Sequence, residues 1–367
     1  MDKHNIIIND EDKLFDVVSK IIEDSRRQIV KAVNTAMVYT YYGVGQYIVE
    51  FEQQGNSRAQ YGKEVLKRLS ERLTEKYGDG WSYANLRSIR QFYMVYSKML
   101  TGGQQIQNAN QRSAFPAFIL PWTHYQILMR VENPQARSFY EIEAAKQQWS
   151  KRYLQRQVGS SLYERLALSR DKDEVMRLAT EGQTLEKTSD VLKDPLVLEF
   201  VGLKPESAYS ESDLESAIIS KLQDFLMECG KGFLFEARQK RFTFDEDHFY
   251  VDLVLYNRIL QCYVLVDLKT DKLTHQDLGQ MQMYVNYFDR YVRLDFEKPT
   301  IGILLCKSKK DALVELTLPK DSNIYASAYE LCLPDKALLQ AKVKEWIDEF
   351  EEQENSSLNE LNEDREG

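Results

Sequence analysis

Two aspartates and a lysine interrupt apolar runs in the C-terminal half of the chain. Asp267 and Lys269 lie in the run VLVDLKTDKL, and Asp252 lies in the preceding run HFYVDLVLYN. Successive side chains of a strand point to opposite faces, so Asp267 and Lys269 project to the same side. An aspartate buried in such a strand is costly unless it has a partner or a metal. If the two runs pair across a turn at Asn257-Arg258, the three side chains converge at one site.

This set of side chains suits the hydrolysis of a phosphodiester. That reaction needs neutralised phosphate oxygens, a hydroxide near neutral pH and a stabilised leaving oxygen, and carboxylate-held magnesium contributes to all three. We predict that Asp252 and Asp267 bind Mg²⁺, which Mn²⁺ could replace, with the backbone carbonyl of Leu268 as a candidate third ligand. Lys269 would orient or activate the attacking water. The alternative is a structural ion pair between Asp267 and Lys269 at a strand end.

A fourth carboxylate lies on a helix predicted at Ser212–Cys229. Leu214 and Ile218 belong to the apolar arc of this helix, and Glu215 falls inside the same arc. One explanation is that Glu215 reaches the metal or a metal-bound water. The other is that Glu215 folds back onto Ser212 in a capping box. Both explanations remain open from the sequence.

A second helix, predicted at Thr274–Arg290, carries two further polar candidates. Gln280 and Tyr284 are four residues apart and share one flank of this helix, whereas Gln282 points to the other flank. We predict that Gln280 and Tyr284 bind the substrate phosphate or order the attacking water. The alternative is a polar helix edge that takes no part in the site.

The elements around these residues predict a layered α/β domain with a mixed central sheet. Short turns at 245–247 and 257–258 suit antiparallel hairpins, and the second helix allows a crossover to a parallel strand. β-branched and aromatic runs place the strands near Phe233–Phe244, Phe249–Tyr256, Cys262–Leu268, Thr300–Cys306 and Ile324–Leu331.

The N-terminal half has long helical patterns with few breakers. Gly78-Asp79-Gly80 ends one amphipathic helix and Ser82 can cap the next, which predicts a helix-turn-helix-like element. Arg87 and Arg90 are three residues apart on the second of these helices and share a face. We predict that they contact nucleic acid, and the alternative is a solvated basic face.

Charge and cysteine usage narrow the classes of partner and metal. The net charge is −9, yet residues 53–165 contain 17 lysines and arginines against 8 acids, so this segment could meet the phosphates of DNA. The four cysteines and four histidines are scattered, which argues against zinc and favours a carboxylate-held cation. No apolar run is long enough to span a membrane, and the first residues do not resemble a signal peptide, so we expect a cytoplasmic protein.

The domain organisation predicted from these patterns has four parts. The chain length favours two domains, and a polar stretch separates the helical and strand-rich patterns. The parts are a helical domain that binds DNA or mediates assembly, a linker, a nuclease-like domain and an acidic tail, at 1–170, 171–205, 206–345 and 346–367.

The motifs resemble those of the PD-(D/E)XK nuclease superfamily, and within it the bacterial YhcG-like family. The similarity covers FYVDLVLYN, VLVDLKTDKLTHQDLGQMQMYVNYFDR and PTIGILLC, and also YGKEVLKRLSERLTEKYGDGWSYANLRSIRQFY in the N-terminal half. The resemblance implies that Asp252, Asp267 and Lys269 occupy the signature positions of a magnesium-dependent nuclease. It also implies that Gln280 and Tyr284 form the Gln-x-x-x-Tyr element of RecB-like members.

The resemblance implies two further features. Glu215 looks like the acid that the family's first helix contributes, although Glu211 and Asp213 lie close enough to compete for that role. The N-terminal domain is expected to bind DNA or to mediate assembly, and an association with restriction or other defence proteins is a weaker implication.

We therefore expect an α+β protein in which a mostly helical N-terminal domain precedes a restriction-endonuclease-like domain. Its expected function is metal-dependent hydrolysis of phosphodiester bonds in DNA. The alternative is a non-catalytic DNA-binding or assembly subunit that retains a nuclease fold. Because one active site cuts one strand, a homodimer is expected for duplex cleavage.

Overall fold

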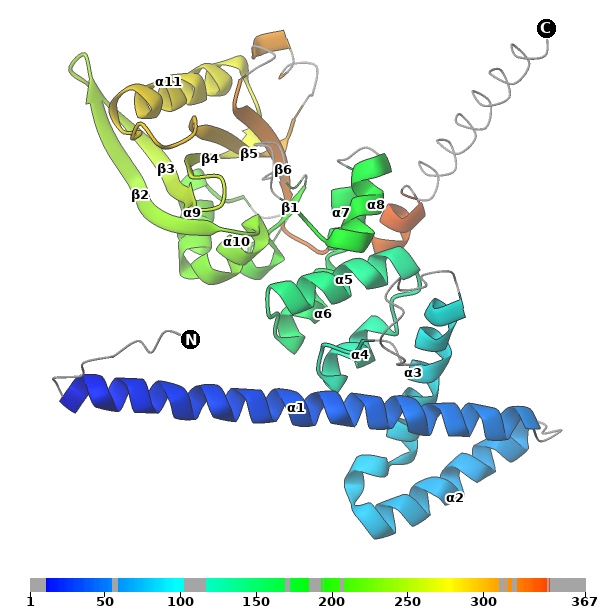
Figure 1. Ribbon diagram of the computed structural model, residues 1–367. Helices are drawn as coiled ribbons and strands as arrows, with labels where there is room; N and C mark the ends of the chain where they lie inside the picture. The colour runs from blue at the N-terminus through cyan, green and yellow to red at the C-terminus, as the bar shows by residue number, and fades with distance from the viewer. Residues whose placement is uncertain are drawn as a thin grey trace, which may run out of the picture. The chain divides into compact units, whose positions relative to one another are not determined.

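The computed structural model divides into two compact units, Met1–Gln155 and Arg156–Gly367, which we describe separately (Figure 1). The predicted acidic tail at 346–367 lies outside the described residues, and the predicted domain bounds stay predictions. The structure describes residues 11–54, 59–101, 117–168, 172–184, 193, 195–204, 208–309, 314, 316–318, 322–341 and 343.

The first unit is built of helices over the residues that the structure describes. The connection predicted at Gly78–Gly80 is a short 3-10 turn, and Ser82 Oγ accepts a hydrogen bond from Asn85 N at the start of the next helix. The helices are α1 (Glu11–Gln54), α2 (Ala59–Tyr77), the 3-10 turn η1 (Asp79–Trp81), α3 (Tyr83–Thr101), α4 (Trp122–Leu128) and α5 (Pro134–Lys146).

Aromatic side chains and one glycine hold α1 against α3. The Phe92 ring is fully buried, and its centroid lies within 6 Å of the centroids of five neighbouring rings. A Cβ at Gly45 would lie 2.5 Å from the Ile89 carbonyl oxygen, so the backbones approach too closely for any larger residue. The packed part of α1 is therefore its second half, where Val38 and Tyr42 are buried.

The second unit contains a six-stranded mixed sheet in the order β1-β6-β5-β4-β3-β2. Strands β2, β3 and β4 pair antiparallel, whereas β4, β5, β6 and β1 pair parallel. The strands are β1 (Leu196–Val197), β2 (Phe233–Phe244), β3 (Asp247–Asn257), β4 (Cys262–Lys272), β5 (Ile301–Ser308) and β6 (Ile324–Glu330). The mixed sheet predicted from the sequence is confirmed, and β1 adds a strand inside the predicted linker at 171–205.

Helices lie on both faces of this sheet (Figure 1). The helix predicted at Ser212–Cys229 is in fact two helices that meet at Lys221, whose backbone leaves the helical range. The helical elements are α6 (Lys151–Gly159), which crosses the boundary between the units, α7 (Leu162–Leu168), α8 (Lys172–Glu181), η3 (Glu199–Val201), α9 (Glu211–Ser220), α10 (Leu222–Cys229) and α11 (His275–Tyr291).

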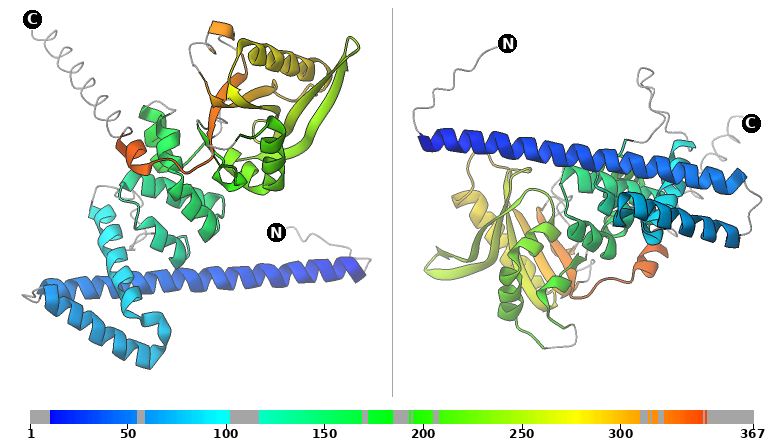
Figure 2. Two further views of the ribbon diagram at one scale, coloured as in Figure 1. Left: turned by 180° about the vertical axis from the view of Figure 1, so that it is seen from behind. Right: turned by 90° about the horizontal axis from the view of Figure 1, so that it is seen from below.

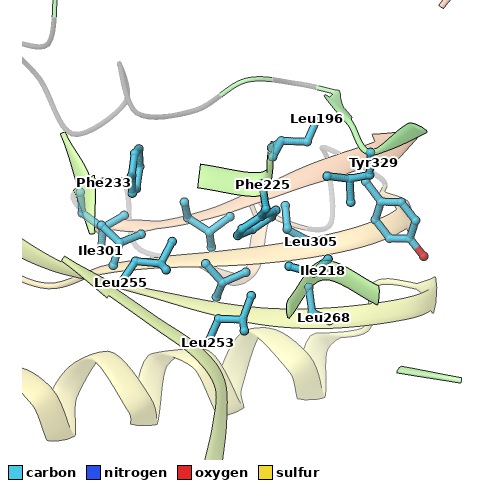
Figure 3. Close-up of a cluster of buried hydrophobic side chains, with 14 of the residues drawn as sticks. Leu196, Ile218, Phe225, Phe233, Leu253, Leu255, Leu268, Ile301, Leu305 and Tyr329 are labelled. Carbon is cyan, nitrogen blue, oxygen red and sulfur yellow. The ribbon is translucent and has the colours of Figure 1, made fainter. Parts of the chain in front are cut away.

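The alternation of side chains along β4 builds a core on each face of the sheet. Val264, Val266 and Leu268 pack with α9 and α10 in one apolar cluster, part of which is shown in Figure 3. Leu265 packs with α11 in the other cluster. Asp267 and Lys269 follow Leu265 at intervals of two, so the same alternation assigns them to the α11 side, at the end of the strand.

Candidate active site

The structure brings Asp267 and Lys269 together on β4, as the strand pattern predicts. Lys269 Nζ lies 2.7 Å from Asp267 Oδ2, and the two side chains are only 16% and 5% exposed. The ammonium group of Lys269 is thus the partner of Asp267 Oδ2 within the protein. A buried carboxylate is costly without such a partner.

Asp252 on β3 joins the pair because β3 and β4 lie side by side. Its Oδ2 accepts a hydrogen bond of 2.7 Å from the backbone N–H of Leu268, and its Oδ1 accepts one of 2.9 Å from Gln239 Nε2. The Leu268 peptide therefore connects the two aspartates directly. The predicted convergence of Asp252, Asp267 and Lys269 is what the structure shows.

The charge of Asp252 disfavours the charge of Asp267. Burial and, after it, this nearby charge outweigh the attraction of Lys269 and raise the pKa of Asp267 to about 6. Burial also raises the pKa of Asp252 above its usual range. Two carboxyl groups that share a desolvated site gain from a bound cation, because the cation removes both penalties.

Lys269 is held as an ammonium ion. Burial by itself would lower its pKa, but the attraction of Asp267 and of Glu211 outweighs burial and raises the pKa above its usual value. Glu211 Oε2 lies 3.6 Å from Lys269 Nζ, and its side chain is about half exposed. Glu211 is thus the acid of α9 that lies nearest to Lys269.

Glu215 is a buried carboxylate that does not cap its helix. The capping box at the start of α9 joins Ser210 and Asp213, so the predicted capping box between Ser212 and Glu215 is wrong. Glu215 instead accepts hydrogen bonds from Arg238 Nε and, at 2.7 Å, from Gln239 Nε2. Asp213 is engaged by Ser210 in that capping box, and the choice of the helical acid stays a prediction.

Gln239 is a site residue that the sequence analysis missed. Its side-chain amide donates to both Glu215 Oε2 and Asp252 Oδ1 and so connects the two acids. Its backbone has φ 47°, in the left-handed region that a non-glycine residue rarely adopts within a strand. In the sequence Gln239 stands between Arg238 and Lys240, where the pattern is that of a solvated strand edge, so no local signal marks it.

Gln280 and Tyr284 contact each other on α11, but they do not share an exposed flank. Gln280 Nε2 donates to the Tyr284 hydroxyl, and Tyr284 is 1% exposed within the core under α11. The sequence predicts that both side chains lie on a polar flank of the helix, and for Tyr284 this prediction is wrong because its ring belongs to the core. Burial raises its pKa, and the charges of Asp267 and Asp252 add to the shift, so the hydroxyl lies within electrostatic reach of the aspartates. Gln282 contacts Asn286 instead.

Arg87 and Arg90 on α3 have different surroundings in the first unit. Arg87 is exposed, whereas Arg90 Nε forms an ion pair of 2.6 Å with Glu52 of α1. The predicted basic face is thus partly neutralised by the protein itself. A role of either arginine in nucleic-acid binding stays a prediction.

The side chains of the site offer carboxylate oxygens, which are ligand atoms for hard divalent cations. Among the described residues, no group of three or more His, Cys, Asp or Glu side chains is placed to hold a metal ion. Magnesium is commonly bound through one or two carboxylates, with waters and substrate phosphates completing its ligands. Asp252 and Asp267 offer two carboxylates of this kind on neighbouring strands.

Within the described part of the chain, every helix is too short or too polar to span a bilayer.

Two solved structures have similarity to part of the chain: a repair endonuclease from Pyrococcus abyssi and EndoMS in complex with double-stranded DNA. Both are 19% identical, with TM-scores of 0.23 and 0.25, and the matches cover 35% and 36% of this chain. The chain spans half the length of each of these structures.

Sequence comparison covers far more of the chain. Residues 189–344 match the YhcG PDDEXK nuclease domain, and residues 17–165 match the DUF1016 N-terminal domain. The chain is 39% identical over 346 residues to the YhcG protein of Escherichia coli (strain K12), which is named a nuclease only provisionally. That alignment covers 89% of this chain and 92% of its relative. The chain therefore belongs to the YhcG family, whose PDDEXK nuclease domain contains the buried aspartates and lysine described above.

Proposed function

We propose that the protein is a magnesium-dependent nuclease that hydrolyses phosphodiester bonds in DNA. One observation carries the proposal: Asp252 and Asp267 are desolvated side by side, each with a raised pKa, next to the ammonium group of Lys269. A purely structural ion pair needs one acid for one lysine, and the second acid adds only repulsion. The surplus negative charge has a physical reason if the site binds a cation.

Asp252 and Asp267 would hold Mg²⁺, with the backbone carbonyl of Leu268 as a further ligand. The chemistry that Mg²⁺ supplies when bound is neutralisation of phosphate charge and acidification of water. The hydrogen bond from Leu268 N–H to Asp252 Oδ2 fixes that carboxylate against β4. The protein thus holds one aspartate in place before any ion arrives, which lowers the cost of assembling the site.

Lys269 would act through hydrogen bonds and charge. Its raised pKa keeps it protonated at neutral pH, so it is a poor acceptor for a proton from water. As an ammonium ion it can orient the attacking water and offset the charge that develops on the phosphate oxygens. We propose this orienting role for Lys269 in preference to proton abstraction.

The remaining candidates would support the aspartates. Glu215 fixes the amide of Gln239, and that amide fixes Asp252, so the two act as positioning residues. Gln280 is half-buried beside the Tyr284 hydroxyl, and we propose that this pair contacts the substrate phosphate or the attacking water. Glu215 could also reach a water bound to the ion.

DNA is the proposed partner because the family carries a nuclease domain and residues 53–165 are rich in lysine and arginine. Arg87 and Arg90 remain the proposed contacts in that segment. The four cysteines, Cys229, Cys262, Cys306 and Cys332, form no disulfide, which supports a reducing, cytoplasmic location. Restriction or other defence proteins are the proposed wider context.

The direct test is a cleavage assay with Mg²⁺ or Mn²⁺ on single-stranded, duplex and branched DNA and on RNA. We expect cleavage of at least one DNA substrate, lost in Asp267→Ala and in Lys269→Ala. Asp271→Ala and Lys272→Ala are matched controls, because these exposed residues lie on the same strand and should leave cleavage unchanged. Full cleavage by both Asp267→Ala and Lys269→Ala would refute the proposal.

Calorimetry separates catalysis from the alternative of a non-catalytic DNA-binding or assembly subunit. The proposed nuclease should release or take up heat on titration with Mg²⁺, and Asp252→Asn should abolish that signal. Absence of a heat signal in both proteins, together with absence of cleavage, would favour the non-catalytic subunit.

A further inference from the structure

The first half of α1 presents apolar side chains to solvent over six turns. Helix α1 is 44 residues long, and its buried residues begin at Val38. Before that point, nine large apolar side chains are each at least 36% exposed: Leu14, Phe15, Val18, Ile21, Ile22, Ile29, Val30, Val33 and Met37. Figure 1 and Figure 2 show α1 as one continuous helix whose first turns extend well beyond α3.

Six of these nine exposed residues form a stripe along one side of the helix. Leu14, Val18 and Ile21 follow one another at steps of four and three, and Ile22, Ile29 and Val33 continue at steps of seven and four. Such steps place side chains on one side of a helix. We call the surface formed by these six residues the α1 stripe.

An unpacked stripe of this kind is not a stable end state in water. Helices gain most of their stability by burying an amphipathic face, and soluble proteins rarely expose large contiguous apolar patches without a partner for them. The α1 stripe is therefore a contact surface. The charges along the same segment indicate which partner it fits.

The charge of the segment reverses at its middle. Residues 14–24 contain three acids and one lysine, a net charge of −2, whereas residues 25–37 contain two arginines and one lysine and no acid, a net charge of +3. Two parallel copies would place like charges side by side. Two antiparallel copies would place the acidic half of each helix beside the basic half of the other.

We propose that α1 pairs with α1 of a second copy of this chain, antiparallel, through the α1 stripe. The helices would cross near Ser25, a small exposed residue that lies within the stripe where the charge changes sign. The resulting dimer would carry two copies of the candidate active site. The pairing itself does not depend on the proposed nuclease activity.

Light scattering of the full chain after size-exclusion chromatography tests the association. The mass of one chain is 43.0 kDa, and we expect about twice this value for the wild type. The double substitution Ile22→Glu with Ile29→Glu should halve the mass, because two carboxylates in the stripe cannot be buried together. Lys20→Ala, on the opposite side of the helix, should remain dimeric. Circular dichroism checks that each variant is folded.

Disulfide trapping tests the orientation, in a background in which the exposed Cys332 is replaced by serine. In an antiparallel pair that crosses at residue 25, position 18 of one helix faces position 32 of the other. Mixing Val18→Cys chains with Ala32→Cys chains should give the mixed disulfide dimer, and Val18→Cys alone should give little.

Three results would overturn the proposal. They are a monomeric wild type, a dimer that persists in the Ile22→Glu, Ile29→Glu variant, and efficient disulfide formation by Val18→Cys alone, which would indicate parallel pairing. Hydrogen exchange then identifies another occupant of the stripe. Strong protection of residues 14–37 in a monomer would assign the stripe to another segment of the same chain.

Discussion

Glu228 and Asp267 are both buried carboxylates in the second unit, yet their surroundings push their pKa values in opposite directions. Burial raises the pKa of Glu228, but Arg165, Lys193 and Arg156 together outweigh it and lower the pKa to about 2. Burial and, after it, the charge of the neighbouring Asp252 outweigh the attraction of Lys269 and raise the pKa of Asp267 to about 6. The number and sign of neighbouring charges, and not the depth of burial, separate the two sites.

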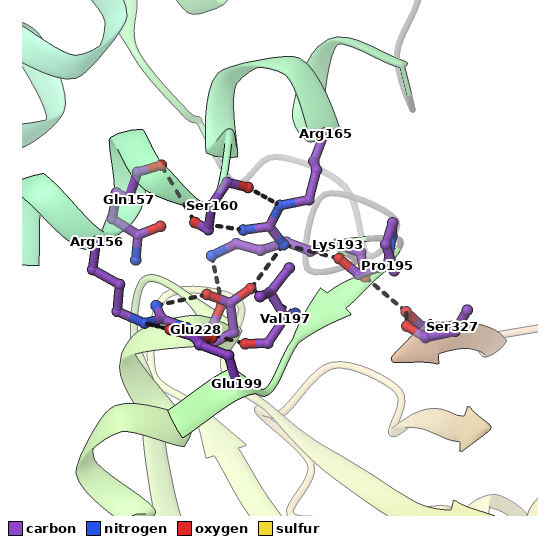
Figure 4. Close-up of polar contacts among 11 residues, drawn as sticks. Arg156, Gln157, Ser160, Arg165, Lys193, Pro195, Val197, Glu199, Glu228 and Ser327 are labelled. Atoms are coloured by element: carbon purple, nitrogen blue, oxygen red, sulfur yellow. Dashed lines mark hydrogen bonds and ion pairs between the residues drawn. The ribbon is translucent and has the colours of Figure 1, made fainter. Parts of the chain in front are cut away.

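The Glu228 cluster is closed by its own hydrogen bonds (Figure 4). Arg165 Nη1 and Arg156 Nη1 donate to the two carboxylate oxygens at 2.8 and 3.0 Å, and the backbone N–H of Val197 donates at 3.2 Å. Lys193 Nζ donates to the backbone carbonyl of Glu228. These bonds attach α6, α7 and the short strand β1 to the end of α10, which is a structural role.

In the Asp267 cluster the buried acids outnumber the nearby basic side chains, whereas around Glu228 the basic side chains outnumber the acid. Asp252 and Asp267 share the nearby Lys269, which forms an ion pair with Asp267 and opposes the rise in the pKa of both acids. A protein that kept this arrangement for stability alone would gain by removing one acid. A surplus of buried like charge, and not buried charge in general, therefore indicates a site for a ligand of opposite sign.

Removal of the Glu228 charge should cause the largest change in stability. Glu228→Gln leaves Arg156, Arg165 and Lys193 without their shared counter-charge, and breaking a buried ion pair from one side costs about 3–5 kcal/mol. Urea unfolding followed by circular dichroism measures this loss. A decrease in the free energy of unfolding below about 1 kcal/mol would show that the cluster is not structural.

The same variant should change the response to acid. Because the folded pKa of Glu228 is lowered, its contribution to stability is present above the unfolded pKa of about 4.3 and is lost as the pH falls toward about 2. The wild type should therefore lose stability over this window more steeply than Glu228→Gln. Equal slopes for the two proteins would contradict the assignment.

Magnesium binding should weaken as the pH falls through about 6. Asp267 is protonated below its raised pKa, and a protonated carboxyl binds the ion poorly, so protons compete with magnesium. Between pH 7 and pH 5 the ionised fraction falls about tenfold for a pKa near 6, and we expect a similar fall in affinity. Calorimetry at several pH values measures it, and constant affinity across this range would count against the shared-acid site.

Loss of the Gln239 amide should have the smallest effect among these predictions. Gln239→Ala frees Asp252 and Glu215 from their shared donor, and one hydrogen bond is worth about 0.5–1.5 kcal/mol, which corresponds to a two- to twelve-fold loss of cleavage rate. Gln239→Gly should show the same loss of cleavage while relieving the left-handed backbone strain. If Gln239→Ala cleaves at the wild-type rate, Gln239 has no positioning role.

Periodicity made much of the second unit predictable. The bounds predicted for β2 agree with those of the structure, and α11 begins and ends one residue after the predicted helix. The convergence of Asp252, Asp267 and Lys269 followed from the same alternation, because a strand fixes which side chains share a face. These are features that ten or more consecutive residues determine locally.

The features that the sequence did not reveal depend on contacts between distant segments. The two residues of β1 are too few for any periodicity. They form a strand because they pair with β6, because the backbone N–H of Val197 donates to Glu228, and because Arg165 donates to the carbonyl of the preceding Pro195. The left-handed Gln239 depends on Glu215 and Asp252, which lie 24 and 13 residues away along the chain. Tyr284 is drawn into the core by Phe242 of β2, which the pattern of α11 alone does not show.

The role of the Asp252–Asp267 pair is tested most directly by one variant, Asp267→Asn, whose DNA cleavage and free energy of unfolding are both measured. Asp267→Asn keeps the shape of the side chain and removes one of the two like charges. We predict that it abolishes magnesium-dependent DNA cleavage, while the free energy of unfolding without metal stays unchanged or increases. Retained cleavage, or a loss of stability as large as that of Glu228→Gln, would contradict the claim that the Asp252–Asp267 pair exists for binding and catalysis.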